Sequence, residues 1–79
     1  MEIRIDSKLQ EEIRKINKKQ LNLFSIDPKH KSLRVHKLSG ELKQLWSISI
    51  NKEIRMVYVQ EKDVVYFSDI GTHDEVYRK

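Results

Sequence analysis

The sequence predicts an α+β fold, in which an N-terminal strand and helix pack on a twisted antiparallel β-meander. Apolar residues recur at helical spacing in the first third of the chain, whereas the second half alternates with a period of two. The breaks between the alternating runs are too short for crossover helices, which favours antiparallel pairing. At 79 residues the chain has room for one domain, expected to cover residues 1–79.

The first expected element is a strand over residues 2–5, where charged residues alternate with isoleucine. A helix is expected to follow it. Ser7 and Gln10 have the spacing of a capping box, and Asp6 can also accept hydrogen bonds from the first-turn amides.

The predicted helix carries one apolar stripe, formed by Leu9, Ile13 and Ile16. It either ends near Asn17 or continues, with a kink, through Leu21 and Phe24. Pro28 ends it in both cases, because the residue before a proline avoids helical backbone angles. Residues 29–44 have little periodicity and are expected to form a loop, with a short extended piece around 33–38.

Three alternating runs then predict the meander. In the first, Trp46, Ile48 and Ile50 share one face and are expected in the core. The second covers residues 54–59, and the third, residues 64–70, is apolar on both faces, which favours a central or covered strand. The breaks between the runs are short enough for hairpin turns.

The charge of the chain is unevenly distributed. The formal net charge is +4, and residues 8–43 contain ten Lys or Arg against four Asp or Glu. From residue 44 onward the counts are five and six. A basic half indicates a polyanionic partner, either nucleic acid or an acidic protein segment, although a lysine-rich helix face can also be merely solvated.

Several classes of protein are disfavoured by what the sequence lacks. Without cysteine, neither a disulfide framework nor a thiolate metal site can form. No apolar run approaches the roughly 20 residues that cross a bilayer, and no signal-peptide pattern is present, so we expect a cytoplasmic protein. The spacing contains no metal-binding motif or glycine-rich phosphate loop, and no cofactor is expected.

The residues that could carry chemistry suit cleavage of a phosphodiester. Such cleavage needs a base, an acid and a cation that holds the charge growing on the phosphoryl oxygens. Histidine suits the first two roles and arginine the third, because its planar fork of donors fits phosphate oxygens. The candidates are His30, His36, His73, Arg34, Arg55, Glu53 and Tyr77. Arg55 lies among apolar strand residues, where a guanidinium needs a specific partner.

Two segments resemble a known family. Residues 36–40, His-Lys-Leu-Ser-Gly, followed by the strand runs at 45–51 and 54–58, resemble the central signature of RelE/ParE-superfamily toxins. The ending at 69–77, Asp-Ile-Gly-Thr-His-Asp-Glu-Val-Tyr, resembles the terminal motif of the YafQ-like branch. The resemblance implies helices on a twisted antiparallel sheet, related in shape to microbial ribonucleases. It also implies a type II toxin that cuts mRNA in the ribosomal A site and is neutralised by a cognate antitoxin.

The resemblance assigns catalytic roles by position. His36 matches the histidine before the Leu-Ser/Thr-Gly step, and Glu53 falls where the branch has a catalytic Asp. His73 and Tyr77 match the terminal acid–base histidine and its aromatic companion. Arg55 matches the strand arginine that YoeB-like relatives use against the scissile phosphate. The basic residues expected to contact RNA are Lys15, Lys18, Lys19, Arg34, Lys37 and Lys43.

The sequence also departs from the pattern of the family. Ser49 stands where YafQ-like enzymes place another catalytic histidine, and the second of two family helices is expected to be shortened or lost. These departures favour an alternative function, that of an inactive binding protein with the same fold. A gyrase-directed binding protein is the other form of this alternative, against which the two histidines and Arg55 argue. Under either function an antitoxin is expected to bind the basic region at 8–43.

Overall fold

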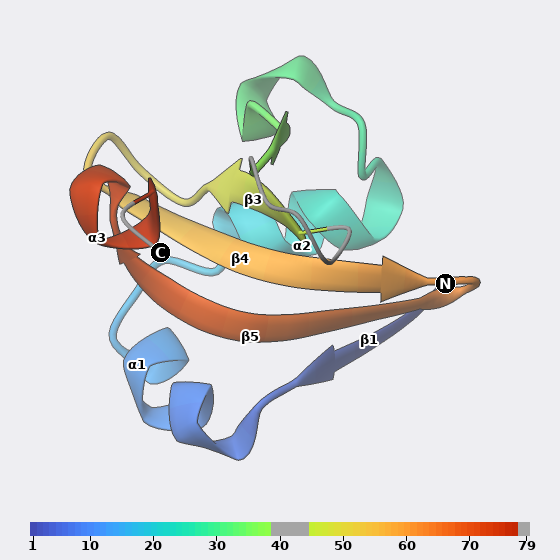
Figure 1. Ribbon diagram of the computed structural model, residues 1–79, viewed down its shortest axis with the longest axis horizontal. Coiled ribbons are helices and arrows are strands. Elements are labelled where there is room, and N and C mark those ends of the chain that lie inside the picture. The colour runs from blue at the N-terminus through green and yellow to red at the C-terminus, as the bar shows by residue number, and fades with distance from the viewer. Residues whose placement is uncertain (39–44, 78–79) are drawn as a thin grey trace.

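The computed structural model contains one five-stranded sheet. It describes residues 1–38 and 45–77, and for His73 and Tyr77 it describes the backbone alone. The strand order is β1-β5-β4-β3-β2 (Figure 1). The strands are β1 (Glu2–Ile5), β2 (His36–Lys37), β3 (Leu45–Ser49), β4 (Ile54–Glu61) and β5 (Val64–Thr72). The α-helices are α1 (Gln10–Arg14), α2 (Lys19–Ile26) and α3 (His73–Tyr77), and short 3-10 turns cover Ser7–Leu9 and Lys31–Leu33.

The predicted antiparallel meander is confirmed for β2, β3, β4 and β5. The N-terminal strand differs, since β1 pairs with β5 in parallel and makes the sheet mixed. Glu2 faces Val64 and Ile5 faces Phe67 in this register. The pairing joins segments from opposite ends of the chain, which no local pattern could have predicted.

The turns form where the sequence predicted hairpins. Between β3 and β4, the Asn51 Oδ1 accepts from the backbone amides of Glu53 at 2.8 Å and Ile54 at 2.9 Å. This side chain therefore closes the turn in the way typical of asparagine. Between β4 and β5, Lys62 adopts a left-handed backbone conformation with φ of 53°.

The helical segment divides into two helices. Asp6 caps the first turn, because its Oδ1 accepts from the Lys8 amide at 2.9 Å. After α1 ends at Arg14, the Asn17 Oδ1 accepts from the Lys19 amide at 2.9 Å where α2 begins. The second helix, expected to be shortened or lost, is therefore present, with 8 residues. It ends at Ile26, ahead of Pro28, as predicted.

The main core lies between the sheet and the helices α1 and α2. Its centre is an aromatic cluster of Phe24, Tyr58 and Phe67, whose ring centroids are 5.2 to 5.4 Å apart in tilted and edge-on arrangements. The surrounding buried residues are Leu9, Ile13, Leu33, Ile48, Ile50, Met56 and Val65. The prediction that Ile48 and Ile50 belong to the core is confirmed, and Trp46 is partly buried against it.

The run at 64–70, predicted to form a central or covered strand, forms β5, which is central in the sheet and covered mainly on one face. β5 is central in its hydrogen bonding, since it lies between β1 and β4, and Val65 and Phe67 are fully buried. Tyr66, however, is 45% exposed and Ser68 is also exposed. Helices cover only part of the second face, so apolar residues on both faces did not mean burial on both.

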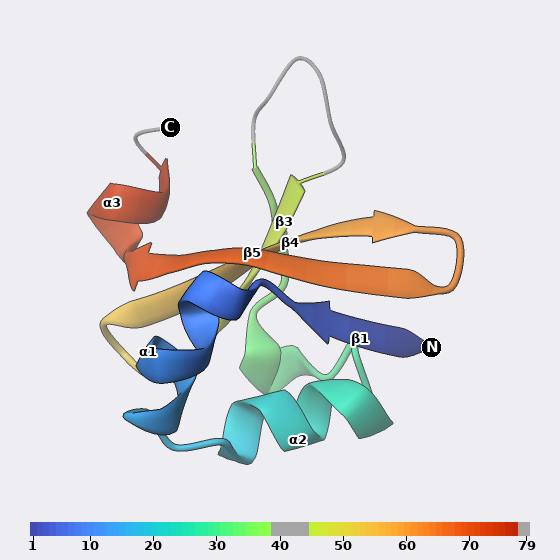
Figure 2. The same cartoon turned by 90° about the horizontal axis from the view of Figure 1, so that it is seen from below.

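The second face carries a smaller cluster. Val76 of α3 packs against Val57 and Leu38, so α3 lies on the opposite side of the sheet from α1 and α2 (Figure 2). We call this side of the sheet the open face. Within the described ranges, no helix is long and apolar enough to span a bilayer.

Candidate active site

On the open face, paired residues of four strands form two adjacent rows, and most of these residues are polar. Residues that pair directly in an antiparallel sheet point to the same face. The register pairs His36 with Ser47, Ser47 with Val57, and Val57 with Asp69. The next row contains Ser49, Arg55 and Gly71.

Arg55 is the most constrained charged residue of this face, with 7% of its surface exposed. Its Nε donates to the Ser47 Oγ at 3.0 Å, and its Nη2 donates to the Ser47 carbonyl at 3.3 Å and to the Arg34 carbonyl. The prediction that this guanidinium has specific partners is confirmed. Hydrogen bonds from a charged donor are stronger than neutral ones, so they fix the orientation of the guanidinium.

Arg34 contributes its carbonyl because of its backbone conformation. It ends the 3-10 turn at Lys31–Leu33 with φ of 47° and ψ of 55°, in the left-handed region. The turn itself begins at His30, whose Nδ1 accepts from the Ser32 amide at 3.1 Å. His30 therefore has a local capping role, and the turn directs the Arg34 carbonyl toward Arg55.

A cavity of about 380 Å³ opens beside Arg55, and we call it the Arg55 cavity. It is lined by Gln20, Arg34, Ser49, Ile50, Asn51, Lys52 and Arg55. Three of these residues are cationic and none is acidic. Such a lining attracts a small anion, and an arginine at its edge can bind phosphate oxygens.

Gln20 holds α2 against this cavity. Its Nε2 donates to the Ser49 carbonyl at 2.9 Å and to the Ser32 carbonyl at 3.1 Å. The bond to Ser49 is made at the end of β3 that the short strand β2 does not reach. One side chain thus links the helix layer, the 3-10 turn and the sheet.

His36 lies on the strand beside Ser47, one of the residues that accept hydrogen bonds from Arg55. Its pairing partner in β3 is Ser47, the residue whose hydroxyl accepts from Arg55. Because paired residues point to the same face, the exposed His36 side chain lies on the face of the sheet that carries Ser47 and Arg55. His36 is not among the residues lining the Arg55 cavity.

The start of α3 is fixed by a capping box. The Thr72 amide donates to the Glu75 carboxylate at 2.8 Å, and the Glu75 amide donates to the Thr72 hydroxyl at 3.2 Å. Hydrogen bonds from the Thr72 backbone and then its side chain lower the pKa of Glu75. At Gly71 a Cβ would lie 3.2 Å from the Glu75 Cβ, so glycine allows this close approach.

The capping box places the backbone of α3 beside β4. Thr72 pairs with Ile54, and His73 is the next residue and the first of α3. Tyr77 is the last residue of the same helix. Since Val76 packs on Val57, the helix lies over the open face near the row that contains Arg55.

Other predicted residues do not line the Arg55 cavity. Glu53 is exposed in the β3–β4 turn and lines an adjoining shallow hollow, which shares Asn51 and Lys52 with the Arg55 cavity. Lys37 extends toward the helix side of the sheet, where its Nζ lies 6.0 Å from the centroid of the Trp46 ring. The remaining basic candidates are Lys15, Lys18 and Lys19, exposed around the α1–α2 junction, and Lys43, outside the described residues.

Sequence reasoning missed Gln20, Lys52, Thr72 and Glu75. The Thr-x-x-Glu spacing at 72–75 is a capping-box signal that could have been read directly. No local signal marks Gln20 or Lys52, because their place at the cavity depends on tertiary packing. In the part of the chain that the structure describes, no three His, Asp or Glu residues cluster in a way that could hold a metal ion.

The whole fold resembles small bacterial toxins of known structure. A metal-bound toxin from Helicobacter pylori matches with a TM-score of 0.73 at 20% identity, over 96% of this chain and 98% of that chain. YafQ from E. coli matches with a TM-score of 0.66 at 16% identity, over 96% and 97%. The toxin of the E. coli DinJ–YafQ toxin–antitoxin complex matches with a TM-score of 0.67 at 18% identity, over 96% of each chain. These likenesses define the fold, which is that of small α+β bacterial toxins such as YafQ.

The family follows from the sequence. A family model described as a bacterial toxin of the type II toxin-antitoxin system, YafQ, matches residues 2–78. The chain therefore belongs to the YafQ family of type II toxins, and the predicted YafQ-like resemblance is confirmed. No curated protein sequence matches the chain.

Proposed function

We propose that this toxin is a ribosome-dependent mRNA interferase that cleaves RNA without a metal or organic cofactor. The observation that carries the proposal is the buried Arg55 guanidinium, which is clamped at the edge of a cavity with three cationic residues and no acidic one. An RNA phosphate is the anion that this arrangement suits best. His36 on the adjacent strand and the start of α3 border the same face.

The reaction needs no external nucleophile. The 2′-oxygen of the ribose attacks the adjacent phosphorus while a base takes its proton. The 2′-O–P bond forms, the P–O5′ bond breaks, and an acid protonates the departing 5′-oxygen. The products are a 2′,3′-cyclic phosphate and a 5′-hydroxyl. Arg55 stabilises the charge that grows on the two non-bridging oxygens.

The acid and base are His36 and His73 in this proposal, because imidazole exchanges protons near neutral pH. Glu53 orients one of them from the β3–β4 turn, and Tyr77 stacks on a base of the substrate. Arg34 and Lys52 line the Arg55 cavity and hold the flanking phosphate charge. Ser49 also lines it and supplies no proton transfer.

The partners follow from the charge distribution and from the relatives. The exposed Lys15, Lys18 and Lys19 make salt-sensitive phosphate contacts with ribosomal RNA in the cytoplasm. A relative of similar fold has been solved as the DinJ–YafQ toxin–antitoxin complex. We therefore expect a cognate antitoxin for this chain as well.

Controlled expression in bacteria tests the proposal. The wild type should arrest growth and produce cuts in ribosome-bound mRNA with 5′-hydroxyl ends, whereas a His73→Ala, Arg55→Ala double variant should do neither. Arg4→Ala is the matched control, since Arg4 is exposed on β1 and pairs with Glu2 at 2.6 Å. Circular dichroism of the purified variants separates loss of activity from loss of folding. A folded double variant as toxic as the wild type would refute the mechanism.

One observation favours a second candidate function. Ser49 lines the Arg55 cavity at the position where YafQ-like enzymes carry a histidine, so the proton-transfer set is incomplete there. The alternative is a binding protein of the same fold that has no ribonuclease activity or acts on gyrase. Toxicity with intact mRNA that gyrase suppressors relieve would support the gyrase form, and the absence of toxicity would support the inactive form.

A further inference from the structure

A second cavity, of about 310 Å³, lies at the opposite end of β3 from the Arg55 cavity. We call it the Trp46 cavity. It is lined by Met1, Pro28, Lys29, Val35, Trp46, Tyr58 and Gln60. Its volume is near the lower end of the range for ligand pockets, about 300–1,000 Å³. The proposed ribonuclease chemistry uses none of these residues.

The floor of the Trp46 cavity is apolar and rigid. Tyr58 is 4% exposed and belongs to the aromatic cluster with Phe24 and Phe67. Burial raises the pKa of the Tyr58 phenol, so the ring stays neutral. Trp46 packs against the same core while remaining partly accessible. An apolar side chain that entered would therefore meet a preformed surface.

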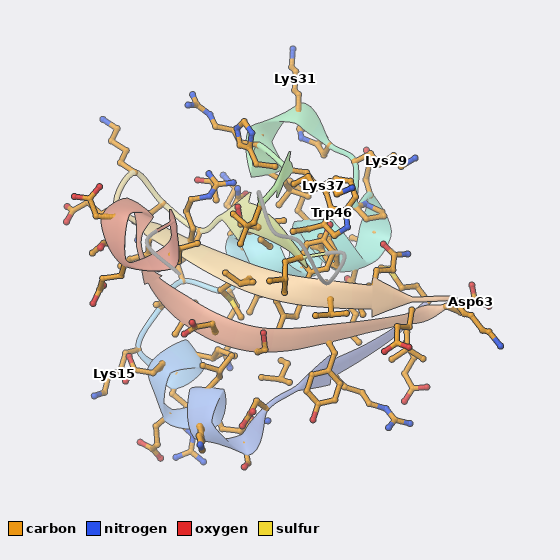
Figure 3. All side chains as sticks on the ribbon, in the orientation of Figure 1. Lys15, Lys29, Lys31, Lys37, Trp46 and Asp63 are labelled. Carbon is orange, nitrogen blue, oxygen red and sulfur yellow. The ribbon has the colours of Figure 1, made fainter. Side chains whose placement is uncertain are left out.

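Two lysines lie at this cavity. Lys29 lines it, and the Lys37 Nζ lies 6.0 Å from the centroid of the Trp46 ring. Figure 3 shows both lysines on the side of the molecule where Trp46 lies. No acidic residue lines the cavity, and within the described ranges neither lysine forms an ion pair.

We propose that the Trp46 cavity binds an acidic peptide segment of a partner protein. One apolar side chain of the segment inserts against Trp46 and Tyr58, and flanking carboxylates pair with Lys29 and Lys37. Charge complementarity supports this occupant, since Lys29 lines the cavity and no acidic residue does. An apolar anchor in a pocket with charged groups at its rim is the usual arrangement of a binding hot spot.

A nucleotide base suits the cavity less well. Stacking needs an accessible aromatic face. Lys37 lies over the Trp46 ring, and the ring also packs on the core. The cavity therefore accepts an aliphatic side chain more readily than a flat base.

This inference rests on the antitoxin partner of the proposed function but not on RNA cleavage. Trp46 and Arg55 lie toward opposite ends of the β3–β4 pair and on opposite faces of the sheet. A failure of peptide binding and a failure of the ribonuclease mechanism can thus be observed separately.

The test uses the single tryptophan of the chain as its reporter. The full chain is titrated with a synthetic peptide that carries one leucine flanked by glutamates, and Trp46 emission is followed. We expect a saturable blue shift that weakens as salt is added. The same peptide with lysines in place of the glutamates should produce no shift.

Variants locate the binding. Lys29→Ala combined with Lys37→Ala should weaken binding by about fivefold, as expected for two pairs at a partly exposed rim. Lys15→Ala, which removes an exposed lysine from the end of α1, is the control and should bind like the wild type. Lys29→Ala alone should leave the rate of mRNA cleavage unchanged, because Lys29 takes no part in the proposed cleavage.

Three results would overturn the proposal. One is unchanged Trp46 emission at millimolar peptide. Another is equal weakening by Lys15→Ala and by the double variant. The third is a stronger, saturable response to a single-stranded RNA oligonucleotide than to the peptide, which would assign the cavity to nucleic acid.

Discussion

The two faces of the sheet differ although they are formed by the same strands. On the helix side, Met56 and Tyr58 pack with Phe24 in a continuous apolar core. On the open face the same strands carry a mixture of apolar and polar residues, and Arg55 is buried there through hydrogen bonds to Ser47 and the Arg34 carbonyl. Adjacent residues such as Arg55 and Met56 thus have different environments.

This difference implies that stability and activity can be changed separately. The apolar face supplies most of the hydrophobic free energy of folding, because that free energy scales with buried apolar area. The open face buries a charge, which contributes little net stability even when it is well hydrogen bonded. Substitutions on the two faces should therefore have distinct signatures.

The largest expected effect on stability is that of Phe24→Ala. It removes the ring that contacts both Tyr58 and Phe67, and truncations of this type cost about 3–5 kcal/mol. A domain with a total stability of about 5–15 kcal/mol has little left after such a loss. Urea unfolding followed by Trp46 emission measures it. Phe24→Leu should cost clearly less, and equal midpoints for both variants would contradict this account of the core.

Arg55→Lys should show the opposite signature. Lysine has a single ammonium group in place of the planar guanidinium fork and cannot reach both Ser47 and the Arg34 carbonyl. We therefore expect mRNA cleavage to fall about a hundredfold, as when one transition-state donor is lost. The free energy of unfolding should fall by only about 1–3 kcal/mol. Cleavage and urea unfolding are measured on the same preparation. A loss of stability greater than that of Phe24→Ala would remove the distinction between the two faces.

Ser49→His tests whether the open face lacks a proton-transfer group. The residue lines the Arg55 cavity, so an imidazole there would reach a bound phosphate. General acid–base groups contribute about 10²–10⁴-fold, and we expect cleavage to rise at least about tenfold. Ser49→Asn is the control, because its amide does not titrate near neutrality. An unchanged rate with histidine would show that the remaining groups are already sufficient.

The smallest expected effect concerns the cap of α3. The pKa of Glu75 is lowered in the folded protein, so its contribution to stability is complete above the ordinary carboxyl pKa and is lost as pH falls through the lowered value. Glu75→Gln should therefore differ most from the wild type near neutrality and converge with it in acid. Thermal unfolding across this range measures the difference. Glu61→Gln, at the exposed end of β4, should show no such convergence.

The elements of the fold could be predicted where their signal is local. Alternation from Trp46 onward predicted the strands, and the Asp6 and Pro28 signals predicted where the helical segment begins and ends. The break between α1 and α2 was left open, because apolar residues continue at near-helical spacing across it. In the structure, the Asn17 Oδ1 accepts from the Lys19 amide at the break, where α2 begins.

The site was less predictable because its contacts are distant in sequence. The resemblance placed Arg55 correctly on a strand, but its bond to the Arg34 carbonyl spans 21 residues. Gln20 reaches the Ser49 carbonyl across 29 residues. No periodicity encodes such pairs, since they depend on how the 3-10 turn and α2 pack against the edge of β3.

The parallel pairing of β1 with β5 has a consequence for the order of synthesis. Glu2 is made well before its pairing partner Val64, because β2, β3 and β4 lie between them in the chain. The strand β1 must therefore wait for its sheet partner until the intervening residues have been made, and such long-range closure is intrinsically slow. The nascent chain completes its sheet only when the final hairpin has emerged.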